Sequence, residues 1–107
     1  MKIAVVSTDG VNVDDHFGKA ERFLVFDLGS QSPDQAEVRP SLPLSANDPN
    51  HPFDAQRFTS IVDVIKDCDK VYMTKIGDIP ADKLKERSIE PVIYKGPIAW
   101  LLASLKP

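Results

Sequence analysis

The chain has 107 residues, of which 13 are basic and 16 acidic, so its formal net charge is −3 at pH 7. This is the length of one domain, and we treat residues 1–107 as a single unit. The acidic balance disfavours general nucleic-acid binding, which usually needs a basic surface. No apolar run approaches the ~18 residues of a membrane span. The N-terminal apolar run ends at Val6, which is too short for a secretion signal, so we expect a cytoplasmic protein.

The chain holds a single cysteine, Cys68. One cysteine excludes an internal disulfide and any zinc or iron–sulfur site built from several cysteines of one chain. A metal would therefore be held by few, non-cysteine ligands or as part of a preformed cluster. We expect Cys68 itself to be a small buried hydrophobe, because it falls on the apolar face of a predicted helix.

The first part of the chain predicts strands joined by short links. Apolar and β-branched residues predict a buried strand over residues 2–7, followed by a loop over 8–15 and a second strand over 22–28. A weaker third strand is predicted over 36–44. Pro40 and Pro43 remove two backbone donors from it, so it belongs at an edge of the sheet.

The remaining chain predicts helices and strands in alternation after a proline-rich loop over 45–54. Asp54 suits the cap of a helix whose apolar residues recur at helical spacing. A strand over 70–74 leads into a loop over 75–78, a short helix starting at Pro80, a strand over 90–94 and a helix starting at Pro97. This order predicts a mixed α/β sheet, antiparallel in its first part and parallel, with right-handed crossovers, in its second.

The densest polar cluster lies in the first loop, where Asp14, Asp15 and His16 precede Gly18. Imidazole is the commonest metal ligand, and loops at strand ends often carry function. A solvated acidic loop is the alternative interpretation of the same residues. A second candidate is the loop over 74–78, because ligands of open α/β sheets bind outside the carboxyl ends of strands. His51, in the proline-rich loop, is either an exposed residue or a second, mobile ligand.

The chain resembles the dinitrogenase iron–molybdenum cofactor biosynthesis family over nearly its whole length in element order, and most specifically in the segment from Lys2 to Asp27. The resemblance lies in a first strand, a loop, the turn His16-Phe17-Gly18-Lys19-Ala20 and a second strand. The family implies a ribonuclease H-like fold, in which a five-stranded mixed sheet of order 3-2-1-4-5 carries helices on both faces. Its members bind iron–sulfur or molybdenum-containing clusters or their precursors, and the histidine of the His-Phe-Gly turn is linked to that binding.

The resemblance therefore implies a non-catalytic, metal-binding carrier related to nitrogen fixation. Its cargo would be an iron–sulfur or iron–molybdenum or molybdenum–sulfide cluster, exchanged with cofactor-assembly or acceptor metalloproteins. His16 would coordinate a metal of the cluster, with His51 as the candidate second ligand, and basic side chains would stabilise the sulfides by charge-assisted hydrogen bonds. The other predicted contact residues are Phe17, Gly18, Lys19, Arg22, Thr74, Lys75 and Gly77.

Two further functions compete with the carrier. A nuclease-like enzyme would need several carboxylates converging on the central strands to hold divalent metals, but only Asp9 lies just beyond the first strand. A metal-free structural or regulatory interaction module is favoured by departures from the family pattern. Gly77 stands alone where the family has a glycine-rich loop, and Arg87-Ser88-Ile89 replaces a helix end that is commonly glycine.

Overall fold

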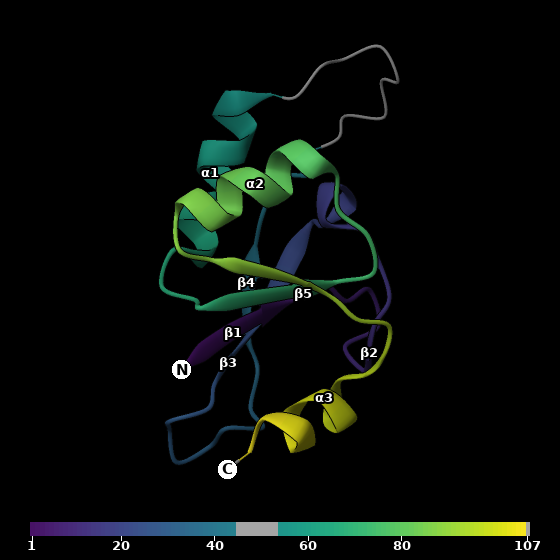
Figure 1. Cartoon of the computed structure of the whole chain (residues 1–107). Coiled ribbons are helices and arrows are strands. Elements are labelled where there is room, and N and C mark those ends of the chain that lie inside the picture. Colours follow the sequence, from purple (N-terminus) through teal and green to yellow (C-terminus); the bar gives the residue numbers. More distant parts are fainter. Residues whose placement is uncertain (45–53, 107) are drawn as a thin grey trace.

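Five strands form one mixed sheet in the computed structural model, which describes residues 1–44 and 54–106 (Figure 1). The strands are β1 (Lys2–Val5), β3 (Arg22–Asp27), β4 (Glu37–Pro40), β5 (Lys70–Met73) and β6 (Glu90–Ile93). Their spatial order is β4-β3-β1-β5-β6. The central strand β1 is antiparallel to β3 and parallel to β5, while β4 is antiparallel to β3 and β6 parallel to β5. Counted along the chain within this sheet, the order is 3-2-1-4-5, which confirms the predicted arrangement.

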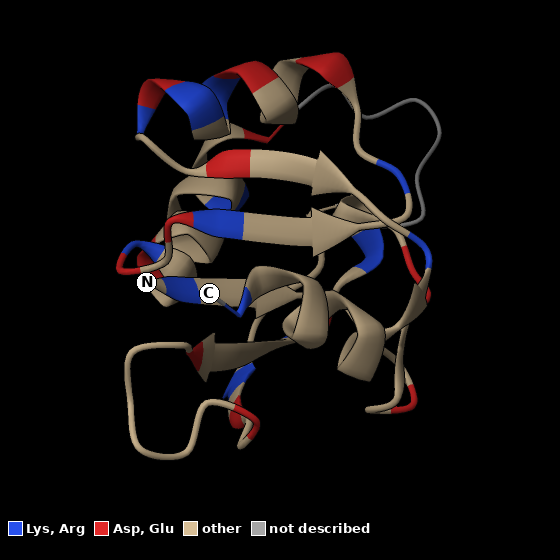
Figure 2. Ribbon diagram, turned by 60° about the horizontal axis from the view of Figure 1, so that its bottom comes forward, with Lys and Arg blue, Asp and Glu red and all other residues tan. Residues whose placement is uncertain are grey.

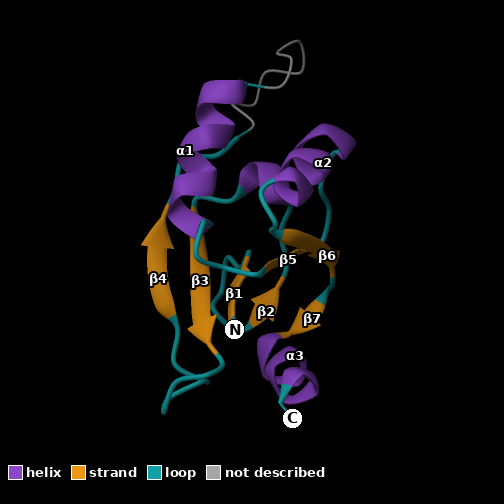
Figure 3. Ribbon diagram, turned by 60° about the vertical axis from the view of Figure 1, so that its left-hand side comes forward, coloured by secondary structure: helices purple, strands orange, loops and turns teal. Residues whose placement is uncertain are grey.

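Helices cover both faces of the sheet (Figures 1 and 3). The helices α1 (Ala55–Ile65) and α2 (Asp78–Glu86) pack on one face, and α3 (Ile98–Leu105) packs on the other. Alternate residues of a strand point to opposite faces, so one strand serves both cores. In β1, Ala4 joins the core under α1 and α2, whereas Ile3 and Val5 join the core under α3.

Proline and capping residues lie at the starts of the helices, although α2 and α3 do not begin at the predicted residues. Asp54 caps α1 as expected, since its Oδ1 accepts hydrogen bonds from the amides of Gln56 at 3.0 Å and Arg57 at 3.1 Å. The helix α2 begins at Asp78 rather than at Pro80, which lies in the first turn. A proline is tolerated there because the first four amides of a helix have no intrahelical acceptor. Pro97 precedes α3 as its N-cap.

Two short elements are absent from the sequence-based prediction. Strand β2 (Asn12–Val13), inside the predicted loop over 8–15, pairs antiparallel with β7 (Gly96–Pro97) in a separate ribbon. Two-residue strands leave no detectable periodicity, which is why the sequence did not reveal them. Gly96 has a φ of 141°, a conformation that only glycine adopts readily. The tyrosine Oη of Tyr94 donates a 2.8 Å hydrogen bond to the Pro97 carbonyl and holds this turn.

Charge is unevenly distributed over the elements (Figure 2). The helix α3 carries no charged residue, whereas α2 carries both acidic and basic residues. The third predicted strand is shorter than expected, since β4 ends at Pro40. Among the described residues no helix combines the length and the apolar character that a membrane span needs. The predicted loop over 45–53, with the candidate ligand His51, lies outside the described residues.

Candidate functional site

The candidate site lies at the carboxyl ends of the parallel strands β1 and β5. Ser7 and Thr8 follow β1, and Thr74 and Lys75 follow β5. The segment that contains His16 meets the end of β5 from a distant part of the sequence. Open α/β sheets place ligands at this edge, because the loops that leave neighbouring parallel strands converge there.

Two backbone hydrogen bonds fix the His16 segment against the end of β5. The amide of Phe17 donates to the Lys75 carbonyl at 2.9 Å, and the amide of Thr74 donates to the Asp15 carbonyl at 3.0 Å. His16 and Lys75 are paired residues of this parallel β-bridge. Paired residues of a bridge project to the same side, so the imidazole and the Lys75 ammonium group belong to one surface. The two loops named as candidates from the sequence therefore meet in the fold.

The side chain of Phe17 anchors this turn in the hydrophobic core. Its side chain is 0% exposed and packs against Phe23, with 6.0 Å between the ring centroids. It opens the 3-10 helix η1 (Phe17–Lys19), which also contains Gly18. The amide of Ala20 donates to the Phe17 carbonyl at 3.2 Å and closes the turn. Phe17 is one of the predicted contact residues, and its side chain faces the core, where it holds the turn that carries His16.

The imidazole of His16 is half-buried at the surface of this turn. The His16 side chain makes no capping hydrogen bond to η1. The backbone amide of His16 donates a 2.8 Å hydrogen bond to Asp15 Oδ1. Within residues 1–44 and 54–106 the imidazole nitrogens have no hydrogen-bonding or ion-pair partner. They are therefore available to coordinate a metal.

The aspartates near His16 shape the loop that follows β1. Asp14 accepts hydrogen bonds from the Thr8 amide at 2.8 Å and the Thr8 hydroxyl at 2.6 Å. Asp9 accepts from the amides of Asn12 and Val11, both at 2.8 Å, and these bonds hold the pKa of its carboxyl well below the usual range. In the sequence, Asp14 stands in the polar cluster with His16, and Asp9 is the carboxylate considered for the competing nuclease. Local hydrogen bonding of this kind is typical of aspartate in turns.

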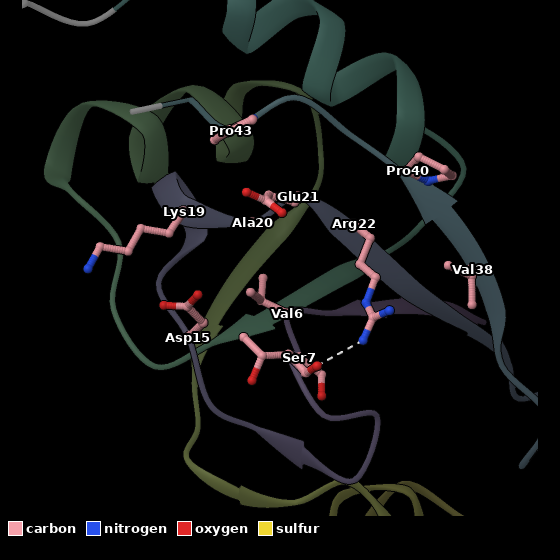
Figure 4. A pocket seen from close by; sticks show the side chains of 11 residues that line it. Val6, Ser7, Asp15, Lys19, Ala20, Glu21, Arg22, Val38, Pro40 and Pro43 are labelled. Atoms are coloured by element: carbon pink, nitrogen blue, oxygen red, sulfur yellow. Dashed lines mark hydrogen bonds between the residues drawn. The ribbon is translucent and has the colours of Figure 1, made fainter. Parts of the chain in front are cut away.

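A pocket of about 730 Å³ opens beside the same segment (Figure 4). It contains two of the predicted basic residues, Lys19 and Arg22, but its lining omits His16, Thr74, Lys75 and Gly77. The predicted site residues thus fall into two groups, one around His16 and Lys75 and one around the pocket. The lining residues are Val6, Ser7, Thr8, Asp15, Lys19, Ala20, Glu21, Arg22, Val38, Pro40 and Pro43.

The donor set limits the kind of metal species that this surface could hold. No group of three or more His, Cys, Asp or Glu side chains with metal-ligand geometry occurs among the described residues. Cys68 is buried, as expected, and burial raises the pKa of its thiol to about 12. A lone imidazole does not complete the coordination of a bare metal ion, but it can supply one ligand to a cluster whose other positions are already filled by sulfide.

A family model described as "Dinitrogenase iron-molybdenum cofactor" matches residues 1–105. The chain belongs to this family. It is 30% identical over 93 residues to the FeMo cofactor biosynthesis protein NifB of Klebsiella pneumoniae, a match that covers 85% of the chain and 20% of NifB. The NifB protein of Chlorobaculum tepidum is 31% identical over 96 residues, covering 90% of the chain and 22% of that protein. The chain thus spans about a fifth of the length of these curated relatives.

Two solved structures share the fold. The crystal structure of PH0822 superposes with a TM-score of 0.67 at 20% identity, covering 97% of this chain and 88% of PH0822. The NMR structure of a Thermotoga protein, named as a candidate NifB protein of the DUF35 family, gives a TM-score of 0.64 at 21% identity. The superposition covers 96% of this chain and 84% of the Thermotoga protein. At these identities the likeness establishes the architecture of the sheet and helices. Family membership places the protein in the context of FeMo cofactor biosynthesis.

Proposed function

We propose that the protein binds and carries a preformed iron–sulfur or molybdenum-containing cluster, or a precursor of one, with His16 as a metal ligand. The observation that carries the proposal is the pairing of His16 with Lys75 at the carboxyl ends of the parallel strands. An imidazole and an ammonium group on one surface are a combination that suits an anionic sulfide cluster, which supports the proposal. The family context in FeMo cofactor biosynthesis supports the same cargo.

The binding mode follows from the chemistry of these two residues. The neutral imidazole coordinates one metal of the cluster. The Lys75 ammonium group donates charge-assisted hydrogen bonds to sulfides, which are worth more than neutral ones. Because the described residues offer a single such ligand, the cluster is held weakly enough to leave. Reversible binding suits a carrier that exchanges cargo with cofactor-assembly or acceptor metalloproteins in the cytoplasm, and it involves no catalysis.

Gly77 offers a second contact on the side of the β5 loop. Its φ is −72°, and an added Cβ would meet only the Pro80 ring, at 3.5 and 3.6 Å. The fold therefore does not require glycine at this position. We propose that Gly77 keeps the backbone next to Lys75 open for the cluster. We also propose that the sheet, with its order 3-2-1-4-5, is ribonuclease H-like.

Cluster uptake by anaerobically purified protein tests the proposal. Preformed iron–sulfide and thiomolybdate species are added separately, and the visible spectrum and the metal bound per chain are measured. We expect stoichiometric uptake of at least one species by the wild type and its loss in His16→Ala. We expect Lys75→Ala to weaken binding by about tenfold, the effect of losing one charge-assisted hydrogen bond.

Matched variants separate the site from general charge effects. Lys85→Ala removes an exposed lysine near the C-terminal end of α2, whereas the loop that holds Lys75 precedes the N-terminal end of this helix. This variant should bind the cluster as the wild type does. Gly77→Ala should keep the wild-type stability while it weakens uptake. Uptake that survives His16→Ala would contradict the proposed ligand. Absence of uptake by the wild type with either species would contradict the carrier and favour a metal-free interaction module.

A further inference from the structure

The pocket beside Arg22 is a separate feature from the surface around His16. Segment 14–16 is extended at His16, with φ −80° and ψ 147°, so neighbouring side chains of this segment project to opposite sides. Asp15 lines the pocket, and His16 does not. The pocket is therefore left without a role by the proposed function. Its volume of about 730 Å³ lies in the range of small-molecule sites.

Arg22 is a positioned cation in the lining of this pocket. Its side chain is half-buried and is held by a 3.0 Å hydrogen bond from Nη2 to the Thr8 carbonyl (Figure 4). An arginine has five N–H donors. Within the described ranges Arg22 has no ion pair, and its side chain lines the pocket, so the other N–H donors of this positioned guanidinium are open to a ligand. A planar fork of this kind matches a carboxylate.

Two carboxylates lie across the pocket from Arg22. Figure 4 shows the carboxylates of Asp15 and Glu21 on one side and the Arg22 guanidinium on the other, with Val6 between them. The ammonium group of Lys19 points outward, away from these three groups. Neither Asp15 nor Glu21 forms an ion pair with another side chain of residues 1–44 and 54–106.

This separation of charge selects among ligands. A simple anion at Arg22 would be repelled by Asp15 and Glu21, whereas a cation at the carboxylates would leave the arginine unmatched. A molecule with a carboxylate and an ammonium group satisfies both sides. The rest of the lining is largely apolar and would accommodate an aliphatic group; these residues are Val6, Ala20, Val38, Pro40 and Pro43.

We propose that this pocket binds a small zwitterion of the amino-acid type with an aliphatic side chain. Its carboxylate lies on the Arg22 guanidinium, and its ammonium group lies between Asp15 and Glu21. The inference goes beyond the proposed cluster carriage and is independent of it, because it uses neither His16 nor Lys75.

Titration of the isotopically labelled wild-type protein followed by NMR tests this proposal without any cluster. The probes are L-leucine, isocaproate, which lacks the amino group, and isoamylamine, which lacks the carboxylate. We expect saturable shifts of the Ser7, Thr8 and Arg22 amides with L-leucine. Each analogue should bind at least about tenfold more weakly, since it leaves one side of the pocket unmatched.

Variants locate the two charge contacts. Arg22→Gln should abolish the preference for L-leucine over isoamylamine, and Asp15→Asn should reduce the preference over isocaproate. Asp15→Asn keeps the Oδ atom that accepts from the His16 amide, so the turn remains formed. The matched controls Arg87→Gln on the exposed end of α2 and Asp63→Asn on the exposed side of α1 should bind L-leucine as the wild type does.

Several results would overturn the proposal. One is the absence of saturable shifts with L-leucine in the wild type. Another is equal affinity for isocaproate, which would show a plain anion site, or equal affinity for isoamylamine, which would show a cation site. Loss of cluster uptake with retained binding of L-leucine would affect only the proposed function, so failures of the two proposals are distinguishable.

Discussion

Replacement of Ser88 by glycine should stabilise the protein, because Ser88 occupies a backbone conformation that suits glycine. Ser88 follows α2 and has a φ of 62°. The amide of Ser88 donates to the Lys85 carbonyl, and the amide of Ile89 donates to the Leu84 carbonyl, both at 3.0 Å. This is the Schellman arrangement that ends many helices. Leu84 and Ile89 are both buried in the core under α1 and α2, so the motif is anchored.

The size of the gain is the difference between two backbone effects. The left-handed conformation costs a residue with a Cβ about 1 to 2 kcal/mol, and glycine avoids this cost. Glycine loses about 0.5 to 1 kcal/mol more conformational entropy on folding. The Ser88 side chain is exposed, so its removal sacrifices no buried contact. We therefore expect Ser88→Gly to raise the free energy of unfolding by about 0.5 to 1 kcal/mol and Tm by roughly 2 to 6 °C.

Urea unfolding followed by circular dichroism measures this change. The matched control is Lys85→Gly in the last turn of the same helix, where the backbone is helical and glycine should destabilise by about 0.5 to 1 kcal/mol. Ser88→Ala, which keeps a Cβ, should give no gain. Equal destabilisation by Ser88→Gly and Lys85→Gly would refute the reasoning, since it would show that Ser88 is not left-handed in solution.

Three other perturbations test the packing and charges of the fold. Hydrogen bonds from Arg39 at 2.6 and 3.0 Å hold the pKa of Asp67 below its usual value of 3.8, so their contribution is present above that value and is lost as the pH falls through the lowered pKa. The free energy of unfolding should therefore fall on acidification below about pH 5. In Asp67→Asn this fall should be smaller by about 1 kcal/mol, because solvent screens the partly exposed pair. An identical pH profile in the wild type and in Asp67→Asn would argue against a stabilising role of this pair. Phe17→Ala should lower the free energy of unfolding by about 3 to 5 kcal/mol in urea titrations, because a fully buried ring beside Phe23 is removed, and a loss below about 1 kcal/mol would mean that the turn is not anchored in the core. Burial raises the pKa of the Cys68 thiol to about 12, so labelling by iodoacetamide at pH 8 should be at least about a hundredfold slower in the native protein than in urea, and equal rates would contradict the burial.

Much of the sheet could be predicted because its strands have strong and simple signals. The apolar runs of β1 and β5 and the helical spacing in α1 are governed by burial, which the sequence expresses directly. The two prolines of the third predicted strand correctly indicated an edge. The β2–β7 ribbon escaped prediction because its stability comes from a tertiary contact between distant segments and not from local preference.

The candidate site was predictable in part for the same physical reason. The family resemblance implied one site that contains both His16 and Lys75, and the two residues are indeed neighbours at the edge where the loops after parallel strands meet. The burial of Phe17 did not follow, because a three-residue turn has no periodicity that separates inward from outward residues. The pocket depends on the register of β3 against β4, which pairs Arg22 with Pro40. The register between strands is set by the assembled sheet, so no sequence motif predicts this pocket.

The most direct test of the account is to ask whether the His16 imidazole coordinates the cluster. Pulsed electron paramagnetic resonance on protein loaded with a paramagnetic iron–sulfur cluster detects nitrogen coupling from a bound imidazole. His16 and His51 are the only histidines of the chain, so His51→Ala leaves His16 alone. We expect imidazole nitrogen coupling in the wild type and in His51→Ala, in which His16 is the one remaining histidine. A loaded wild-type protein without this coupling, or coupling that disappears in His51→Ala, would contradict the account.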